Sequence, residues 1–264
     1  MATNDEGKRT IGSVDTALGV LEALRSLDGA TLGELAEEVD LSKGALHTHL
    51  TTLRDHGFVE HRGDSYALGR RFLTFGEYVR NSVPLYRAAK GEVDELAAET
   101  DECVHLITEE DGQESILYEA FGDRAVGREF FLKNREAMGR YLHYSAAGKS
   151  ILSQLDESRV HDIIDEHGLP AATKHTITDR EEFMAELAAV RERGFATNDE
   201  EDLLGIRAVG SPVLGPDGDV LGALSVSGPA SRLQDERFTE EYPRLVKEYV
   251  NIIELNLQTG DVSV

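Results

Sequence analysis

The stretch Thr31–Leu68, TLGELAEEVDLSKGALHTHLTTLRDHGFVEHRGDSYAL, decides the fold of the N-terminal part of this chain. Thr31 and Glu34 have the spacing of a capping box, which predicts the start of a short helix. A tight turn then leads into a second helix over about 42–56, and two short extended runs around Gly63 indicate a β-hairpin. An amphipathic helix precedes the stretch. Three helices followed by a hairpin, with a short turn between the second and third helices, are typical of a winged helix-turn-helix.

The rest of the chain has the pattern of a larger α/β domain, so the expected fold class is α+β. Thr178 and Glu181 form a second candidate capping box, and Pro84 interrupts a helix that should link the two parts. We expect strands at about 104–107, 115–118, 208–213 and 220–227, and helices at about 147–155, 180–193 and 239–257. The predicted division is a disordered tail over 1–10, a winged helix-turn-helix over 11–69, a linker helix over 70–87 and the α/β domain over 88–260.

The chain is strongly acidic: 50 Asp and Glu against 27 Lys and Arg give a net charge of −23 over 264 residues. Such an excess of carboxylates destabilises a compact protein unless salt screens the repulsion, so we expect a halophilic protein in molar salt. Residues 1–80 contain 9 basic and 13 acidic residues, and the remainder contains 18 and 37, so the second domain is the more acidic. The acidic runs over 109–111 and 199–202 are interpreted as solvated loops.

Composition and segment lengths restrict the class of protein further. The single cysteine argues against a disulfide scaffold, an iron–sulfur cluster and a multi-cysteine zinc site. The N-terminal residues are polar and lack the pattern of a signal peptide. No run approaches the ~18 apolar residues that a membrane span needs. The sequence therefore predicts a soluble cytoplasmic protein that has no membrane partner.

The leucines of the predicted helix over 42–56 assign its faces. Leu46, Leu50 and Leu53 recur at i, i+4 and i+7 and should face the core. The polar residues between them should lie outside, where the positive helix N-terminus can meet phosphates or base edges; the alternative is a merely solvated face. An arginine at the hairpin tip suits a minor-groove or phosphate contact. The predicted contacts to double-stranded DNA are Ser42, Lys43, Gly44, His47, Thr48, Thr51 and Arg62.

Motifs along most of the chain resemble the IclR family of transcription regulators. They are SVDTALGVLE at 13–22, LTTL at 50–53, YALG at 66–69, LHYSAAGK at 142–149, RERGFA at 191–196, GIR at 205–207 and SVSGP at 225–229. The resemblance spans about residues 11–260 and implies a winged helix-turn-helix followed by a GAF-like effector domain. It also implies a homodimer or dimer of dimers on a pseudopalindromic operator near genes for carbon-source catabolism. A small-molecule effector, often a carboxylate or an aromatic acid, would change the affinity for DNA.

The resemblance places an effector pocket beside the Ser-x-Ser pair of the SVSGP motif. Ser225 and Ser227 are two residues apart on a strand, so their hydroxyls share one face and could both bind one carboxylate. Without the resemblance, satisfied hydroxyls on a strand face would be the favoured interpretation. The effector-binding residues that the resemblance implies on this chain are Ala146, Ala147, Asn198, Ile206, Ala208, Ser225 and Ser227.

Three positions depart from the pattern of the family. Thr48 stands where an arginine is common, Asn198 where an acid is frequent, and Ala208 where a cysteine is frequent. The identity of the effector is therefore not transferable from the family to this chain.

Patterns for other chemistry are incomplete. The run over 148–150, Gly-Lys-Ser, is half of a phosphate-binding loop, but His143 replaces the glycine required five residues earlier. Ser225 lacks the flanking glycines of a hydrolase nucleophile elbow. Cys103 and His105 should share one strand face, where a core thiol and a polar-face histidine are favoured over a metal site.

We therefore expect a ligand-responsive transcription regulator that is not an enzyme and needs neither cofactor nor metal. The bound ligand would change the arrangement of the effector domains, and the linker helix would transmit this change to the DNA-binding heads. One alternative is a metabolic enzyme with an appended helix-turn-helix, which would turn over a candidate ligand. Another is a purely architectural DNA-binding protein, whose melting temperature would not respond to any ligand.

Overall fold

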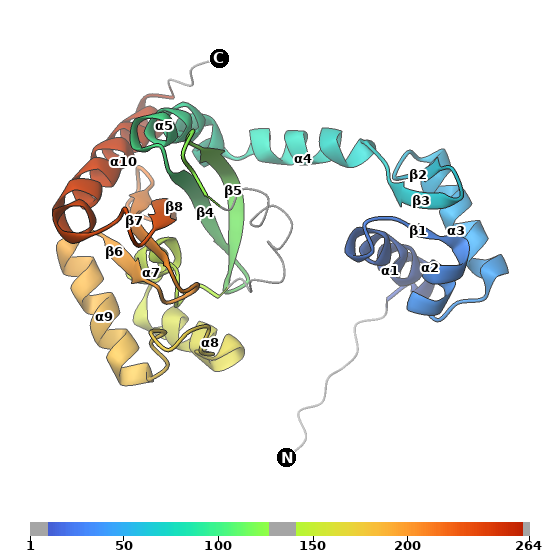
Figure 1. Cartoon of the computed structure of the whole chain (residues 1–264), viewed down its shortest axis with the longest axis horizontal. Coiled ribbons are helices and arrows are strands. Elements are labelled where there is room, and N and C mark those ends of the chain that lie inside the picture. Colours follow the sequence, from blue (N-terminus) through green and yellow to red (C-terminus); the bar gives the residue numbers. More distant parts are fainter. Residues whose placement is uncertain (1–9, 127–140, 261–264) are drawn as a thin grey trace. The chain divides into compact units, whose positions relative to one another are not determined.

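The computed structural model describes residues 10–126 and 141–260, which form two compact units, Met1–Ser82 and Val83–Val264 (Figure 1). Except for Thr10, the tail predicted over 1–10 lies outside the described residues. The structure confirms the expected class, a helix-turn-helix domain followed by an α/β domain.

The first unit is a winged helix-turn-helix. Its elements are α1 (Gly12–Ser26), β1 (Ala30–Thr31), α2 (Leu32–Glu38), α3 (Lys43–Asp55), β2 (Val59–Arg62), β3 (Ser65–Leu68) and α4 (Arg71–Ser82). The predicted hairpin pairs β2 with β3, and the sequence analysis missed β1, which adds a third antiparallel strand on the other side of β3. Leu35, Leu46 and Leu50 are buried in one core with Val20 and Leu24 of α1, so the core-facing leucines of α3 are as predicted. The apolar stripe expected on the first helix is only partly confirmed, because Val14 and Leu18 are exposed.

The starts of two helices test the capping residues that were predicted from local sequence. The predicted capping box of α2 is present: Glu34 N donates to Thr31 Oγ1, and Thr31 N donates to Glu34 Oε2 at 2.8 Å. The predicted cap of α9 (Arg180–Arg193) is wrong by one residue. Asp179, not Thr178, precedes the helix and accepts a hydrogen bond from Glu182 N. Aspartate is among the strongest N-cap residues, so it displaces the neighbouring threonine.

The linker helix predicted over 70–87 ends earlier than expected. Helix α4 stops at Ser82, and a separate helix, α5 (Pro84–Thr100), begins directly after Val83. Proline fixes φ and has no N–H, so it is well suited to the first position of a new helix. Leu85 and Tyr86 are buried and belong to the second unit rather than to a linker.

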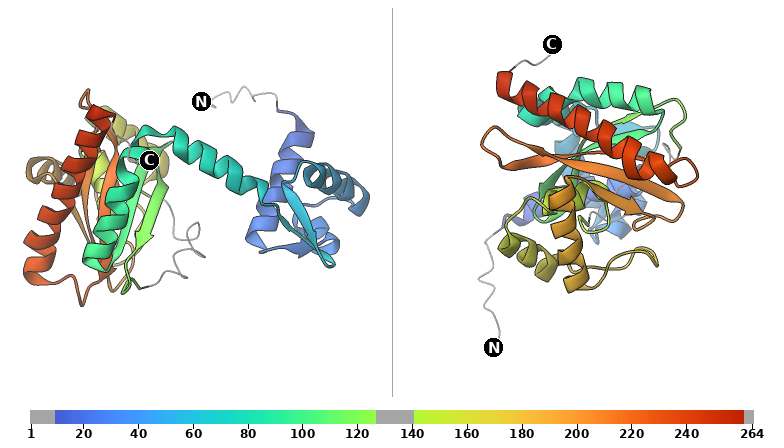
Figure 2. Two further views of the ribbon diagram at one scale, coloured as in Figure 1. Left: turned by 90° about the horizontal axis from the view of Figure 1, so that it is seen from above. Right: turned by 90° about the vertical axis from the view of Figure 1, so that its left-hand side faces the viewer.

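The second unit is a five-stranded antiparallel sheet between two layers of helices (Figures 1 and 2). The strand order is β5-β4-β8-β7-β6. Helices α5 and α10 cover one face, and α7, α8 and α9 lie on the other (Figure 2, right). Besides α5 and α9, the elements are β4 (Cys103–Glu110), β5 (Gln113–Phe121), α7 (Ala146–Leu152), α8 (Glu157–His167), β6 (Ala196–Asp199), β7 (Ile206–Leu214), β8 (Val220–Pro229), η1 (Arg237–Glu241) and α10 (Tyr242–Thr259). The sequence analysis missed β6 and α8.

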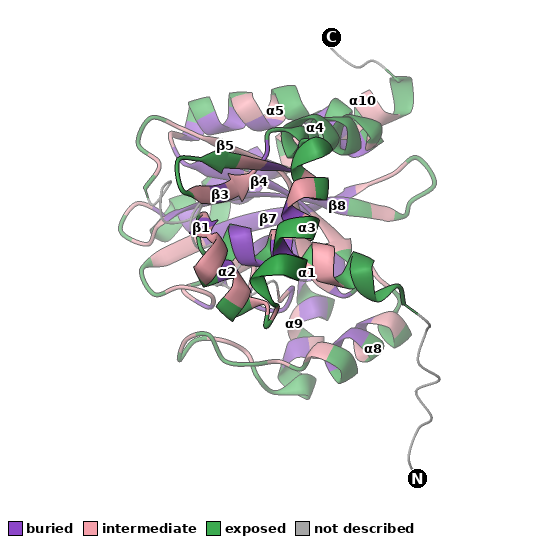
Figure 3. Ribbon diagram, turned by 90° about the vertical axis from the view of Figure 1, so that its right-hand side faces the viewer, coloured by how far each residue is buried: buried purple, intermediate pink, exposed green. Residues whose placement is uncertain are grey.

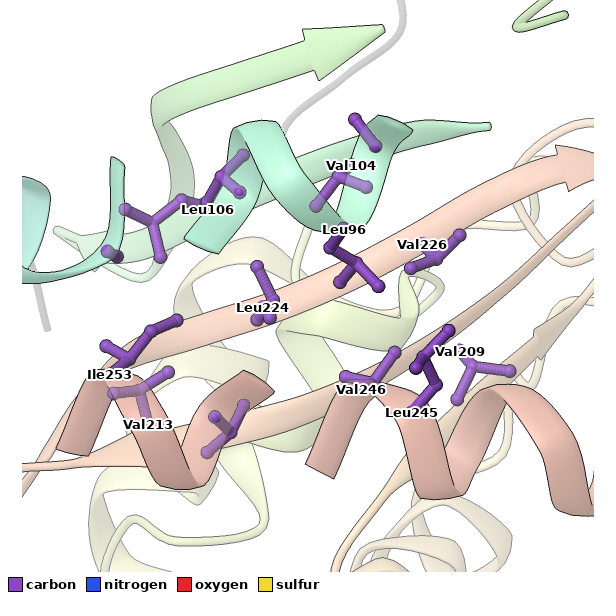
Figure 4. Close-up of a cluster of buried hydrophobic side chains, with 14 of the residues drawn as sticks. Leu96, Val104, Leu106, Val209, Val213, Leu224, Val226, Leu245, Val246 and Ile253 are labelled. Atoms are coloured by element: carbon purple, nitrogen blue, oxygen red, sulfur yellow. The ribbon is translucent and has the colours of Figure 1, made fainter. Parts of the chain in front are cut away.

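Side chains alternate between the two faces of the sheet, as the pleat requires. On the face under α5 and α10 the strands bury mainly apolar residues; Val104, Leu224 and Val226 pack there with Leu96 and Val246 (Figure 4). Strands β7 and β8 are buried along most of their length, whereas α4 is exposed throughout (Figure 3). On the opposite face the same strands carry polar residues, and helix α7 covers them.

Helix α7 lies backbone against backbone on β7. A Cβ atom added at Gly210 would lie 2.8 Å from both the carbonyl carbon and the oxygen of Ala146. Only glycine permits this approach, which holds the first turn of α7 against the centre of the sheet. The contact positions Ala146 and Ala147 over the polar face of β8.

We expect Gly210→Ala to lower the free energy of unfolding of the second unit by about 1–3 kcal/mol, because the new methyl group must displace α7. Gly91→Ala in α5 is the matched control: nothing lies within 4 Å of its added Cβ, so the change should be neutral or stabilise by up to ~1 kcal/mol. Denaturant unfolding in concentrated KCl measures both. Equal effects at the two positions would contradict the close contact.

Candidate functional site

A cavity of about 120 Å³ lies between α7 and the polar face of the sheet. It is comparable in size with the roughly 150 Å³ cavity that is known to admit benzene. Strands β4, β5, β6, β7 and β8, the start of α7 and the loop after β6 all contribute to its wall. All seven residues that the family resemblance implied line this one cavity: Ala146, Ala147, Asn198, Ile206, Ala208, Ser225 and Ser227.

The sequence analysis did not assign the ionisable residues of this cavity. They are His105 on β4, Glu114 and Glu119 on β5, and Asp202 in the loop after β6. The remaining lining residues are Ile107, Ile116, Tyr144 and Ser145. The alternation of polar and apolar residues along β4 and β5 was a signal for this polar wall, because the polar residues lie on the face opposite the apolar core. Such a pattern does not distinguish a cavity from solvent.

His105 is hydrogen-bonded within the cavity wall. Its Nε2 lies 3.1 Å from Ser227 Oγ and 3.2 Å from Cys103 Sγ, and its Nδ1 lies 3.7 Å from Glu119 Oε2. Burial by itself lowers the pKa of His105, but Cys103 and Glu119 outweigh it and raise that pKa above its ordinary value. The imidazolium and the Glu119 carboxylate therefore form a charge-balanced pair.

Glu114 and Asp202 supply two further carboxyl groups. Glu114 accepts a hydrogen bond from Ser145 Oγ, and Asp202 Oδ1 accepts one from Asn198 Nδ2 at 2.7 Å. Burial raises the pKa of Glu114 to about 7, and the negative charge of Asp202 acts in the same direction. Burial also raises the pKa of Asp202. The positive charge of His105 lowers both pKa values in part, but burial outweighs it, so both carboxyl groups are costly to ionise.

The two predicted serines differ in their surroundings. The Ser227 hydroxyl is bonded to His105. Ser225 is only 5% exposed, and its hydroxyl makes no hydrogen bond to any residue within 10–126 or 141–260. A buried hydroxyl facing a cavity with no protein partner is available to a ligand.

A buried ion pair supports the wall of the cavity behind Asp202. Lys149 of α7 is 1% exposed, and its Nζ lies 2.6 Å from Glu201 Oε1. The interpretation of 199–202 as a solvated loop is therefore wrong for Glu201, which is 6% exposed. Because Lys149 forms an ion pair with Glu201, its positive charge does not balance the carboxyl groups that line the cavity.

In the first unit, α3 presents the predicted polar face. Leu46 and Leu50 are buried, and Leu53 is partly buried, while Lys43, His47 and their neighbours point outward. Exposed residues of the predicted DNA-binding set are Ser42, Lys43, Gly44, His47, Thr48 and Arg62; Thr51 is half-buried. Ser42 is the N-cap and accepts a hydrogen bond from Ala45 N. Its hydroxyl therefore already has one role in the helix.

Two features of this surface affect how it could contact DNA. The hydroxyls of Thr48 and Thr51 donate to the carbonyl oxygens four residues earlier, which leaves their oxygens free to accept. Arg62, at the end of β2 beside the hairpin turn, has its Nε 2.6 Å from Glu60 Oε1. To contact a phosphate, Arg62 would have to release Glu60. This costs little, because an exposed ion pair is weak in water.

Within its described residues, the structure provides no support for a metal site at Cys103 and His105. Between 10–126 and 141–260, no three His, Cys, Asp or Glu residues are grouped so that they could hold a metal ion. His143 is buried, and its Nε2 donates to Pro170 O instead of approaching Cys103. None of the helices in that part of the chain has both the length and the apolar character required to cross a bilayer.

Both units match models of one protein family. Residues 13–63 match the IclR helix-turn-helix domain, and residues 77–254 match the bacterial transcriptional regulator IclR C-terminal domain. The two matches follow each other in the order of the two units and together cover most of the chain.

Relatives and solved structures agree with these matches. The chain is 44% identical over 98% of both lengths to the probable HTH-type transcriptional regulator ArcR of Halobacterium salinarum. It is 30% identical to the acetate operon repressor of Salmonella typhimurium, over 90% of this chain and 87% of the repressor.

Among solved structures, IclR of Thermotoga maritima superposes with a TM-score of 0.79 at 25% identity, over 94% of this chain and 99% of that one. The inducer-binding domain of PobR from Acinetobacter, a double mutant in complex with 3-hydroxybenzoic acid, has a TM-score of 0.56 at 25% identity. That alignment covers 63% of this chain and 95% of the domain. From its two domains in this order and its near full-length relatives, the chain belongs to the IclR family of transcription regulators.

Proposed function

We propose that this IclR-type regulator reads DNA with the outer face of α3 and responds to a small molecule bound between α7 and the sheet. The observation that carries the second part is the convergence of all seven implied pocket residues on one cavity. The 3-hydroxybenzoic acid in complex with the inducer-binding domain of PobR supports it by analogy, since that domain has the same fold. The acetate operon repressor supports a role near genes of carbon metabolism in the same way.

For DNA binding, the support comes from the exposure and chemistry of α3. Lys43, Gly44 and His47 are exposed at the N-terminal end of the helix, where the helix dipole favours phosphate. The half-buried Thr51 is placed at the edge of this surface. Because the unit is not basic, base-edge contacts and shape would carry much of the specificity.

We propose that binding takes place in concentrated salt in the cytoplasm, where the chromosome lies. The net charge of −23 and the relative from Halobacterium salinarum support this environment. Counterion release contributes little to affinity at molar salt, which is consistent with an arginine-poor reading helix.

A homodimer, alone or as a dimer of dimers, is part of the same proposal. Two helices of the first unit expose apolar side chains that a monomer would leave in water. Val14 and Leu18 of α1 are at least half exposed, and α4 exposes Leu73, Tyr78 and Val79 still more. Pairing of two chains would bury such residues and would place two reading heads on one pseudopalindromic operator.

A metabolic enzyme with an appended helix-turn-helix is the second candidate. The members of the matched family are transcription regulators. His105 lies within hydrogen-bond reach of Ser227 and Cys103, but its raised pKa keeps the imidazole protonated, so it cannot take a proton from either side chain. Turnover of any ligand by the pure protein would favour the enzyme.

We expect Lys43→Ala to weaken binding to a DNA sequence selected from a random library by about tenfold or less in molar KCl. The slope of log K against log salt concentration should fall by about one unit, because one phosphate contact is lost. Lys90→Ala in the second unit is the matched control and should change neither value; its charge is paired with Asp94. Titrations followed by fluorescence anisotropy measure both, and an unchanged slope for Lys43→Ala would contradict the assignment.

We expect Ser225→Ala, alone or with Ser227→Ala, to abolish the ligand-induced shift in melting temperature while operator affinity stays within about twofold, because the hydroxyls lie in the second unit. A ligand found by a thermal-shift screen in concentrated KCl is the probe. Ser158→Ala, at an exposed position of α8, is the control. A full ligand response in the double variant would show that the ligand binds elsewhere.

A further inference from the structure

Among the residues that the structure describes, the acidic side chains lining the cavity outnumber the cationic ones. Glu119 is matched by the imidazolium of His105, whereas Glu114 and Asp202 have only neutral hydrogen-bond partners, Ser145 and Asn198. None of the lysines and arginines within the described residues lines the cavity, and Lys149 behind it is paired with Glu201. Among the described residues, His105 is therefore the one cationic side chain in the lining, and it does not balance three ionised carboxylates.

An unpartnered polar group marks the same space as a ligand site. Ser225 is only 5% exposed and lines the cavity. Its hydroxyl has no hydrogen-bond partner among the described residues. A native protein rarely leaves a buried hydroxyl without a partner, so a group supplied by a ligand is the natural complement. A cluster of acidic residues alone does not mark a ligand site; here a cavity and the unpartnered hydroxyl of Ser225 coincide with it.

We propose that the effector carries a protonated nitrogen, as an ammonium, amidinium or guanidinium group, which Glu114 and Asp202 bind inside this cavity. The inference rests on the proposed function of the cavity as the effector site and names the chemical class of the ligand. An amidinium or guanidinium group offers several N–H donors in one plane, which suits bonding to carboxylates. A simple carboxylate would add a further negative charge beside two acids and could bind only if they took up protons.

The affinities for a cationic ligand and for a carboxylate ligand should change in opposite directions with pH. With a pKa of about 7, Glu114 is mainly protonated near pH 6 and mainly ionised near pH 8. A cation needs the ionised form, so its affinity should rise by about tenfold over this range. An anion needs the protonated form, so its affinity should fall.

The other ionisable groups around Glu114 do not reverse this sign. His105 on β4, with its raised pKa, stays protonated, and Glu119 on β5 stays paired with it. The pKa of Asp202 is raised as well, so its ionisation with rising pH also favours a cationic ligand. Burial raises the pKa of Tyr144 to about 12, so its phenol stays neutral.

Three probes of nearly the same shape separate these possibilities: benzamidine, benzamide and benzoate differ in the charge of one planar head group. Calorimetric titration of the full chain in concentrated KCl near pH 8 measures their affinities. We expect benzamidine to bind at least tenfold more tightly than benzamide, and benzoate to bind most weakly. The affinity for benzamidine should rise between about pH 6 and pH 8, where this amidine remains protonated.

Glu114→Gln removes the charge and retains the shape of the side chain. We expect it to weaken benzamidine binding on the order of tenfold and to flatten the dependence on pH, while leaving benzamide binding unchanged. Asp202→Asn is a second variant with the same expected direction. Glu110→Gln, at an exposed position of β4, removes an equal charge outside the cavity and should leave all three affinities unchanged.

The outcomes separate the inference from the function on which it rests. If benzoate binds more tightly than benzamidine, and Ser225→Ala weakens it, the cavity is the effector site and the assignment of a cationic ligand is wrong. If benzamidine does not bind at millimolar concentration, the inference is overturned, whereas the proposed function of the cavity is tested separately by the thermal-shift screen with Ser225→Ala. Equal affinities for benzamidine and benzamide would also overturn the inference, because charge would then have no effect.

Discussion

The candidate site depends on one backbone contact, the approach of α7 to β7 at Gly210. Because no Cβ fits between Gly210 and Ala146, the first turn of α7 rests directly on the sheet. The N-cap residue Ser145 is thereby placed where it bonds Glu114 of β5, a residue 31 positions away in sequence. Lys149, one turn further along α7, reaches Glu201 beyond the end of β6. One helix of two turns thus joins both edges of the sheet around the cavity.

The charges around α7 follow a consistent physical pattern. Ionised groups that are fully buried are paired, as Lys149 is with Glu201, because an isolated charge in the interior would be too costly. Glu114 and Asp202, which face the cavity, accept hydrogen bonds from neutral donors and have raised pKa values. The family pattern has an acid where Asn198 stands, yet a carboxylate lies beside that position here as well, because Asn198 donates to Asp202. The cavity therefore contains more acid than the motif alone indicates.

Much of the fold was predictable from sequence, because it depends on local signals. The capping box of Thr31, the leucine stripe of α3 and the turn at Gly63 define the first unit within fewer than forty residues of each other. The pocket residues came from family resemblance, since no local rule brings Ala146 and Ser225 together. The ionisable wall was not predicted, because alternating polar residues on a strand, and an acidic run such as 199–202, look the same whether they face water or a cavity. The short strand β1 depends on tertiary pairing with β3, which a local pattern does not contain, whereas Pro84 was a local signal for the end of the linker.

The central claim is that the space beside Gly210 holds a ligand through the charges on its wall. The most direct measurement is a crystal structure of the protein grown with benzamidine from concentrated salt. We expect electron density for the ring between α7 and β8, with the amidinium within hydrogen-bond distance of Glu114 and Asp202. An empty cavity beside saturating benzamidine, or an amidinium turned away from both carboxylates, would contradict it.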